Sequence, residues 1–263
     1  MNKNAIIVIV ALVVVVGAIL LYSNGSFNNL GNKNADDKTM TDKNSNKSES
    51  SAKGTVFFSV TDATTDMGAI SGIAMTVDKV EMKSEAKGWV TVSETPAIFD
   101  LLELKAKNRT ELLAKVDVTA DTYSQVRLHV TKIIVTESGK AKEAKLPSNE
   151  LKINGEVKVT SGAESSAKID VLASESLHKT GKGEFIFAPV VKFESRSDAN
   201  VEVASDNSVT ISGGKAGSVL TVGMDINGEV KENFRLDIKA NLELDGGVIK
   251  LDGKSKAKID LDL

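Results

Sequence analysis

Residues 125–135 read Gln-Val-Arg-Leu-His-Val-Thr-Lys-Ile-Ile-Val, and this stretch decides the fold class. Apolar Val126, Leu128 and Val130 alternate with polar residues. Successive side chains of a strand point to opposite faces of a sheet, so the stretch predicts a strand with one dry face and one polar face. Such strands are typical of a two-layer all-β protein in which one face of each sheet is buried.

Shorter stretches of the same kind precede this strand. Residues 56–60, 73–77 and 89–92 each combine alternation with Val, Ile, Thr or aromatic residues, and each predicts a strand. Leucines within residues 98–115 predict one or two short helical turns instead. Many short strands separated by turn residues favour an antiparallel β-sandwich or barrel.

Three dipeptides predict tight hairpins: Asn154-Gly155, Asn227-Gly228 and Asp245-Gly246. A type I′ turn needs positive φ at both central residues, which Asn, Asp and Gly accept. The stretch that begins at Asp225 also resembles the start of a calcium loop, but its twelfth position is Leu236 rather than a bidentate Glu. A hairpin is therefore the better interpretation of that stretch.

The run from Ala5 to Tyr22 is apolar and carries no charge. As a helix it would extend about 27 Å, enough for the hydrocarbon core of a bilayer. Bulky residues follow it where a cleavage site needs small ones, so we expect an uncleaved single-pass signal anchor over residues 1–22; a cleaved signal would instead give an exported form. Lys3 is the only charge before the run, which favours a cytoplasmic N-terminus and extracytoplasmic C-terminal domains.

Residues 23–53 are rich in Asn, Ser, Lys and Asp and cannot bury enough apolar surface to fold, so they predict a disordered tether. Alternation resumes over residues 54–195, the predicted β-sandwich domain, and continues over residues 196–263. We expect the latter to be a C-terminal β module packed on the sandwich, because an isolated domain of this length is marginally stable. The alternative is an extension of the first sandwich.

Several short motifs follow one another in a characteristic order: Gly54-Thr55-Val56, Thr61-Asp62-Ala63, Trp89, Phe99-Asp100-Leu101-Leu102, Thr122-Tyr123, Gln125-Val126-Arg127-Leu128, Leu146-Pro147-Ser148 and Phe187-Ala188-Pro189-Val190. On these motifs, residues 54 to about 195 resemble the bacterial and archaeal domain of unknown function numbered 4382. The resemblance implies a secreted or surface-attached β-sandwich and supplies no established activity and no catalytic residues. Members are often lipoproteins, whereas this chain lacks the Cys that lipidation requires. We therefore expect an immunoglobulin- or transthyretin-like antiparallel β-sandwich with a C-terminal β extension, preceded by one transmembrane helix.

The composition disfavours several classes of function. With no Cys the chain forms no disulfide, and with two His a zinc site would depend on carboxylates, so we expect neither a metal nor a cofactor. The 33 basic and 36 acidic residues give a net charge of −3 without a long basic block, so we expect no nucleic-acid partner.

Asp62, Asp100 and Arg127 are the candidate charge set. They could form an ion-binding or ligand-clamping group, because carboxylates bind hard cations and arginine binds carboxylates. The favoured interpretation is structural: the two aspartates cap turns and Arg127 pairs with one of them across the sheet. His129 shares a face with Arg127, and His178 falls in a polar stretch. We expect both histidines at the surface, without a catalytic partner.

Three Asn-X-Ser/Thr sequons, at Asn24, Asn46 and Asn108, are possible glycosylation sites of an exported chain. No catalytic or cofactor-binding residue is assigned.

The sequence favours a non-enzymatic, membrane-anchored surface protein that binds an envelope glycan or protein, or mediates adhesion. The alternative is a self-assembling surface subunit that associates by β-strand addition, with Ala257–Leu263 as the donor or acceptor segment. An extracytoplasmic enzyme that cleaves polysaccharide with paired carboxylates is less favoured.

Overall fold

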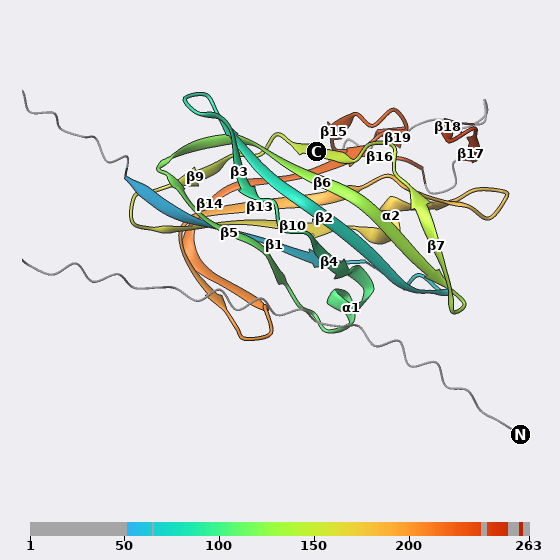
Figure 1. Cartoon of the computed structure of the whole chain (residues 1–263), viewed down its shortest axis with the longest axis horizontal. Helices are drawn as coiled ribbons and strands as arrows, with labels where there is room; N and C mark the ends of the chain where they lie inside the picture. Colours follow the sequence, from blue (N-terminus) through green and yellow to red (C-terminus); the bar gives the residue numbers. More distant parts are fainter. Residues whose placement is uncertain (1–51, 65, 238–240, 252–257, 260–263) are drawn as a thin grey trace, which may run out of the picture. The chain divides into compact units, whose positions relative to one another are not determined.

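A computed structural model describes residues 52–64, 66–237, 241–251 and 258–259 of the chain (Figure 1). The predicted transmembrane helix and nearly all of the predicted tether lie outside the described residues. No helix within the described residues is long and apolar enough to cross a membrane.

Strands dominate the described part of the chain, which confirms the all-β prediction. One sheet has six strands: β1 (Lys53–Asp62), β5 (Glu111–Thr119), β10 (Glu164–Val171), β13 (Val190–Val203), β14 (Val209–Met224) and β15 (Val230–Glu232). A second has nine: β2 (Ile70–Ser84), β3 (Gly88–Ser93), β4 (Ala97–Asp100), β6 (Asp121–Glu137), β7 (Lys140–Lys145), β8 (Glu150–Ile153), β9 (Val157–Val159), β11 (Leu177–Lys179) and β12 (Phe185–Phe187). The remaining elements are helices α1 (Leu101–Ala106) and α2 (Ala173–Ser176) and the strand pairs β16 (Phe234–Arg235) with β19 (Lys258–Ile259) and β17 (Leu242–Asp245) with β18 (Val248–Leu251).

The main core receives side chains from both large sheets. Val126, Leu128 and Val130 of β6 are at most 3% exposed and pack in one cluster with Phe58 of β1 and Phe193 of β13. The alternation of residues 125–135 therefore has the expected result: its apolar side faces the other sheet. Burial of such side chains is the main favourable contribution to folding.

Most strand pairs among the described residues are antiparallel, but two are parallel, so the predicted antiparallel sandwich is wrong for those two pairs. The order of the six-stranded sheet is β15-β14-β13-β10-β1-β5, and β1 pairs in parallel with β10, with Thr55 opposite Glu164. β12 also pairs in parallel with β7. Parallel neighbours need a long connection between them, and the chain between β1 and β10 provides one by building most of the other sheet first.

The hairpin predicted at Asn154-Gly155 is wrong. β8 and β9 do not pair with each other; both pair with β6, β8 at Val126–His129 and β9 at Asp121–Tyr123. Gly155 therefore lies in the gap between β8 and β9, two separate strands that pair with the same neighbour, β6. Its φ is not positive, and a Cβ there would lie 2.6 Å from the ring of Phe193. The glycine is needed for close packing rather than for a turn.

The other two predicted hairpins are confirmed. β14 and β15 are joined by residues 225–229, where Gly228 has a φ of 84° and Asp225 accepts the N–H groups of Asn227 and Glu229. β17 and β18 are joined by Gly246 and Gly247, both with positive φ. Both turns use the conformation that glycine adopts without steric cost.

The helical turns predicted within residues 98–115 are present as α1. Asp100 begins this helix by accepting the N–H groups of Leu102 and Glu103 at 3.1 and 3.2 Å. The rest of that stretch is not helical, because residues 111–115 form the first half of β5 and pair with β1. Tertiary pairing here determines the conformation of a stretch whose leucines are compatible with both states.

The domain boundary predicted at residue 195 falls inside β13. β13 and β14 form a long antiparallel pair that extends the six-stranded sheet. Beyond β15, a second core cluster forms from Phe234, Leu236, Leu242 and Ile249 together with Ile186 and Ala188. Within the segment considered for strand addition, Lys258 and Ile259 pair with β16 of the same chain.

Candidate functional site

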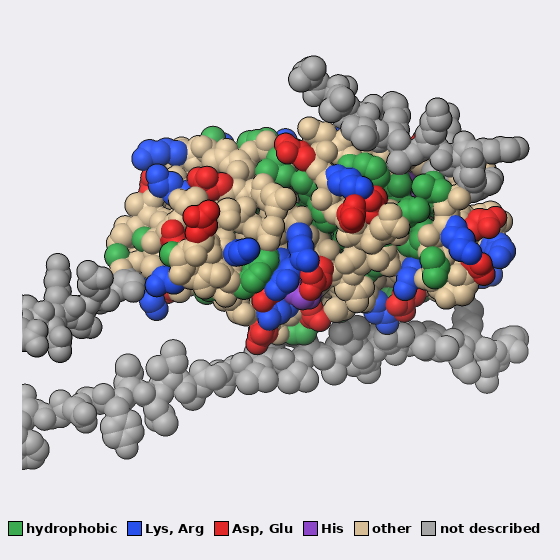
Figure 2. All heavy atoms as spheres, turned by 90° about the horizontal axis from the view of Figure 1, so that it is seen from above, with side chains coloured by type: hydrophobic (Ala, Val, Ile, Leu, Met, Phe, Trp, Pro, Cys, Tyr) green, Lys and Arg blue, Asp and Glu red, His purple; other side chains and the backbone are tan. Residues whose placement is uncertain are grey.

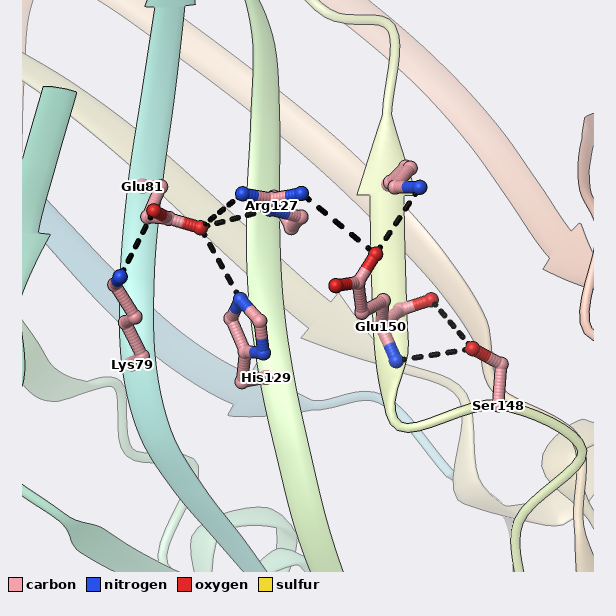
Figure 3. Close-up of polar contacts among 7 residues, drawn as sticks. Lys79, Glu81, Arg127, His129, Ser148 and Glu150 are labelled. Carbon is pink, nitrogen blue, oxygen red and sulfur yellow. Dashed lines mark hydrogen bonds and ion pairs between the residues drawn. The ribbon is translucent and has the colours of Figure 1, made fainter. Parts of the chain in front are cut away.

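A group of charged side chains lies on the outer face of the nine-stranded sheet. Val80 and Met82 point into the core, so Lys79 and Glu81 of β2 point outward. The antiparallel ladder places Glu81 opposite Arg127 and Lys79 opposite His129, and β8 adds Glu150 opposite His129. We call Lys79, Glu81, Arg127, His129 and Glu150 the outer-face cluster (Figure 3).

Glu81 is the centre of this cluster. Its Oε2 accepts from Nε of Arg127 at 2.7 Å and lies 3.1 Å from Nε2 of His129, while Oε1 lies 3.0 Å from Nζ of Lys79. Although it points outward, Glu81 is only 5% exposed, because these long side chains cover it. Burial raises the pKa of Glu81, but hydrogen bonds from Lys79, His129 and Arg127 outweigh burial and lower the pKa to about 2.

Arg127 is held from several sides. Besides its bonds to Glu81, its Nη1 lies 3.7 Å from a carboxylate oxygen of Glu150. Its guanidinium carbon lies 4.1 Å from the centroid of the Trp89 ring on β3, a cation–π contact. A planar guanidinium fixed between a carboxylate and an indole forms a rigid platform.

Such an arrangement suits recognition more than proton transfer. Glu81 stays ionised through the physiological range, and both of its oxygens already have partners. A general acid or base must be able to exchange its proton near the working pH. Within the described part of the chain, no group of three or more His, Asp or Glu residues is placed to hold a metal ion.

An open cavity of about 430 Å³ adjoins the cluster on the side of Glu150. Its volume is within the range of small-molecule sites. The turn between β14 and β15 forms its far wall. Its lining comprises Gln125, Ser148, Glu150, Lys152, Asn154, Gly228, Glu229, Val230 and Lys231. Figure 2 shows basic and acidic side chains gathered side by side around a histidine on the surface.

The predicted charge set does not come together. Asp62 accepts the N–H groups of Thr64 at 2.9 Å and of Ala173 at 3.4 Å, and Asp100 caps α1. The predicted pairing of Arg127 with one of these aspartates is wrong, because its acidic partners are Glu81 and Glu150, which the strand register places beside it. Burial raises the pKa of Asp62 even though several hydrogen bonds oppose the change.

The two histidines differ. His129 is partly exposed beside Arg127, as its position in the alternation predicts. The prediction that His178 lies at the surface is wrong: it is 3% exposed, in β11, opposite Ile186 of the second core cluster. Most residues near His178 in the sequence are polar and give no sign of this burial. It arises because Phe234 and Leu236, far downstream in the chain, cluster with Ile186 of the neighbouring strand β12. Neither ring nitrogen of His178 has a hydrogen-bond partner among the described residues.

Asn108 of the third sequon, two residues after the end of α1, is exposed and has a φ of 47°, a conformation that asparagine adopts more readily than most residues. Asn24 and Asn46 lie outside the described residues.

Sequence reasoning overlooked Glu81 and Lys79. The alternation of Glu81 with Val80 and Met82 indicates an outward position, but the sequence does not indicate the register that places Glu81 opposite Arg127.

Replacing Glu81 by glutamine is expected to lower the free energy of unfolding by about 1–2 kcal/mol at neutral pH, because Lys79, Arg127 and His129 lose a charged acceptor yet remain partly hydrated. The folded pKa of Glu81 is below its ordinary value, so its contribution is present above pH 4.5 and is lost as the pH falls from 4.5 toward 2. Urea denaturation across this range should show a weaker acid dependence in Glu81→Gln than in the parent protein. Equal slopes would contradict the assignment.

The family comparison agrees with the resemblance seen in the motifs. The family model for a domain of unknown function (DUF4382) matches residues 53–189, more than half of the 263 residues. The match begins with β1, ends directly before β13 and includes the whole outer-face cluster. Searches among curated proteins and among solved structures each gave no match. The chain therefore belongs to the DUF4382 family.

Proposed function

We propose that this protein is a non-enzymatic, membrane-anchored surface protein whose β-sandwich, of immunoglobulin- or transthyretin-like type, binds an envelope glycan or protein outside the cell. The observation that carries the proposal is the outer-face cluster, whose charged groups are bound to one another, beside the open polar cavity lined by Glu150 and Lys152. The charged side chains of the cluster hold one another in place through ion pairs and hydrogen bonds, which favours a preorganised binding surface over a surface that moves protons.

The location outside the cell is supported by the sequence. An uncharged run long enough to span a bilayer precedes a polar stretch, and the β domain follows both. A polar tether of this length would hold the domain about 30 Å from its anchor.

The orientation is tested by adding protease to intact cells that express the full chain with a C-terminal epitope. Digestion of the β domain on intact cells, with a cytoplasmic marker left whole, is the expected result. Protection on intact cells followed by digestion after lysis would refute the extracytoplasmic location.

The binding role is tested with the purified full chain in detergent and the insoluble envelope fraction of the same cells. Lys152 lines the cavity and pairs with Glu150 at 3.0 Å. Lys152→Glu should reduce the bound fraction about tenfold, because it places like charges side by side at the cavity wall. The matched control is Lys215→Glu, on a distant hairpin with an 82% exposed side chain. Equal binding by both variants and the parent protein would exclude the cavity as the binding surface.

Stripping the envelope fraction with protease before the assay separates the two classes of ligand. Retained binding identifies a glycan, and lost binding identifies a protein.

A further inference from the structure

The end of the β13–β14 hairpin, orange in Figure 1, leaves the six-stranded sheet. The bend falls where Asp198, Gly213 and Gly214 have φ values of 53°, 63° and 70°. A Cβ on Gly214 would lie 2.6 Å from the carbonyl oxygen of Ser197. Only glycine allows the two strands to approach this closely in that conformation.

The hairpin is fixed at its tip and along its side. At the tip, the N–H of Val209 donates to the carbonyl of Thr110 at 2.8 Å, and the N–H of Leu112 donates to the carbonyl of Asn207 at 2.9 Å. Along the side, the N–H of Val201 donates to a carboxylate oxygen of Glu164 at 3.0 Å. The hairpin therefore crosses from β13 and β14 to the chain that leads into β5, and it stands over the outer face of β10.

A cavity of about 340 Å³, which we call the hairpin cavity, lies under this crossing. Its floor comes from β10 and β13, and its wall comes from the start of β14. Its residues are Thr110, Ser166, Lys168, Glu194, Arg196, Val209, Thr210 and Ile211. The family match ends before β13, so the cavity combines the family domain with the hairpin that follows it.

Among the residues that line the cavity, two cations, Lys168 and Arg196, accompany one carboxylate, Glu194. Glu194 is shared by Lys168 and Lys192, each at 2.8 Å. Arg196 donates from Nη1 to the carbonyl of Gly213 at 2.9 Å, and among the described residues it has no carboxylate partner. Asp170, whose pKa burial raises, lies further along β10, opposite Lys192. The lining therefore carries one positive charge in excess, and the guanidinium of Arg196 has donors left for a ligand.

The other lining groups restrict the class of anion. Hydroxyl groups of Thr110, Ser166 and Thr210 can both donate and accept, and Val209 and Ile211 provide an apolar wall. The volume is near the lower end of small-molecule sites. A compact ligand with one carboxylate, several hydroxyl groups and an apolar C–H face meets all of these conditions.

We propose that the hairpin cavity binds an acidic sugar: one pyranose ring that carries a carboxylate, free or at the end of a glycan. Arg196 and Lys168 bind the carboxylate, and the hydroxyl groups and Glu194 bind the ring hydroxyls. The inference goes beyond the proposed function, because this cavity lies on the other sheet, away from the outer-face cluster.

The test is titration calorimetry of the purified full chain in detergent with D-glucuronate, using D-glucose as the neutral counterpart. Glucuronate should bind at least about tenfold more tightly than glucose. Arg196→Gln should weaken glucuronate binding about tenfold or more, and Arg196→Lys should restore part of the loss. Lys215→Gln removes a positive charge from the same hairpin outside the cavity and should leave binding unchanged.

Circular dichroism checks that each variant is folded, and Thr210→Trp, which fills the cavity without a change of charge, is the second route to loss of binding. Absence of glucuronate binding, equal binding of glucose, or unchanged binding by Arg196→Gln and Thr210→Trp would each overturn the proposal. The envelope assay with Lys152→Glu is independent, so a failure there with retained glucuronate binding counts against the proposed function alone.

Discussion

Replacing Phe193 by alanine is expected to lower the free energy of unfolding by about 3–5 kcal/mol, the range for loss of a buried aromatic side chain. Phe193 is fully buried in the main core, in the strand between β10 and β14. Its ring also reaches the break between β8 and β9 in the opposite sheet, where it contacts Gly155. Loss of the ring therefore leaves a cavity between the two sheets.

The contact between Phe193 and Gly155 can be tested separately, by substituting both residues singly and together. A Cβ at residue 155 would lie 2.6 Å from two carbons of the Phe193 ring, so Gly155→Ala should cost about 1–3 kcal/mol by overpacking. In a Phe193→Leu background the ring is absent, and the added methyl group should cost less. Chemical denaturation followed by fluorescence of Trp89, the one tryptophan of the chain, measures all four variants of this cycle.

The control is Val219→Ala on β14, where the side chain is 62% exposed and a change of at most about 0.5 kcal/mol is expected. Equal costs of Gly155→Ala in the two backgrounds would refute the direct contact between residues 155 and 193.

Acidification is expected to destabilise the protein through His178. Burial lowers its pKa from 6.5 to about 4, although the charge of Asp237 acts in the opposite direction. The folded state therefore binds fewer protons than the unfolded state between these values. The stability is complete above pH 6.5 and is lost as the pH falls toward 4. A shift of this size corresponds to about 3 kcal/mol.

The matched variant is His178→Leu, which keeps an apolar side chain of similar size and cannot titrate. Denaturation at intervals from pH 7.5 to 3.5 should show that the parent protein loses about 3 kcal/mol more than the variant. Most of this difference in stability should arise above pH 4.5, where the contribution of Glu81 to the stability does not depend on pH. Parallel curves for the two proteins would show that folding does not lower the pKa of His178.

Particular residues show how far the sequence determined this protein. The alternation of residues 125–135 and 56–60 determined strand identity and the buried face, because the period of side-chain direction is a local property. The turns at Gly228 and Gly246 and the cap at Asp100 followed from the local chemistry of Asn, Asp and Gly. The motifs over residues 54–195 were sufficient to identify the DUF4382 family.

Only the tertiary structure decided which strands are neighbours. The parallel pairing of β1 with β10 joins residues about a hundred positions apart, and no local pattern encodes that choice. For the same reason, the sequence does not predict the partners of Arg127, the burial of His178 or the packing role of Gly155. Each of these depends on strand register or on the packing of distant chain segments, whose energies come from contacts between residues far apart in the sequence.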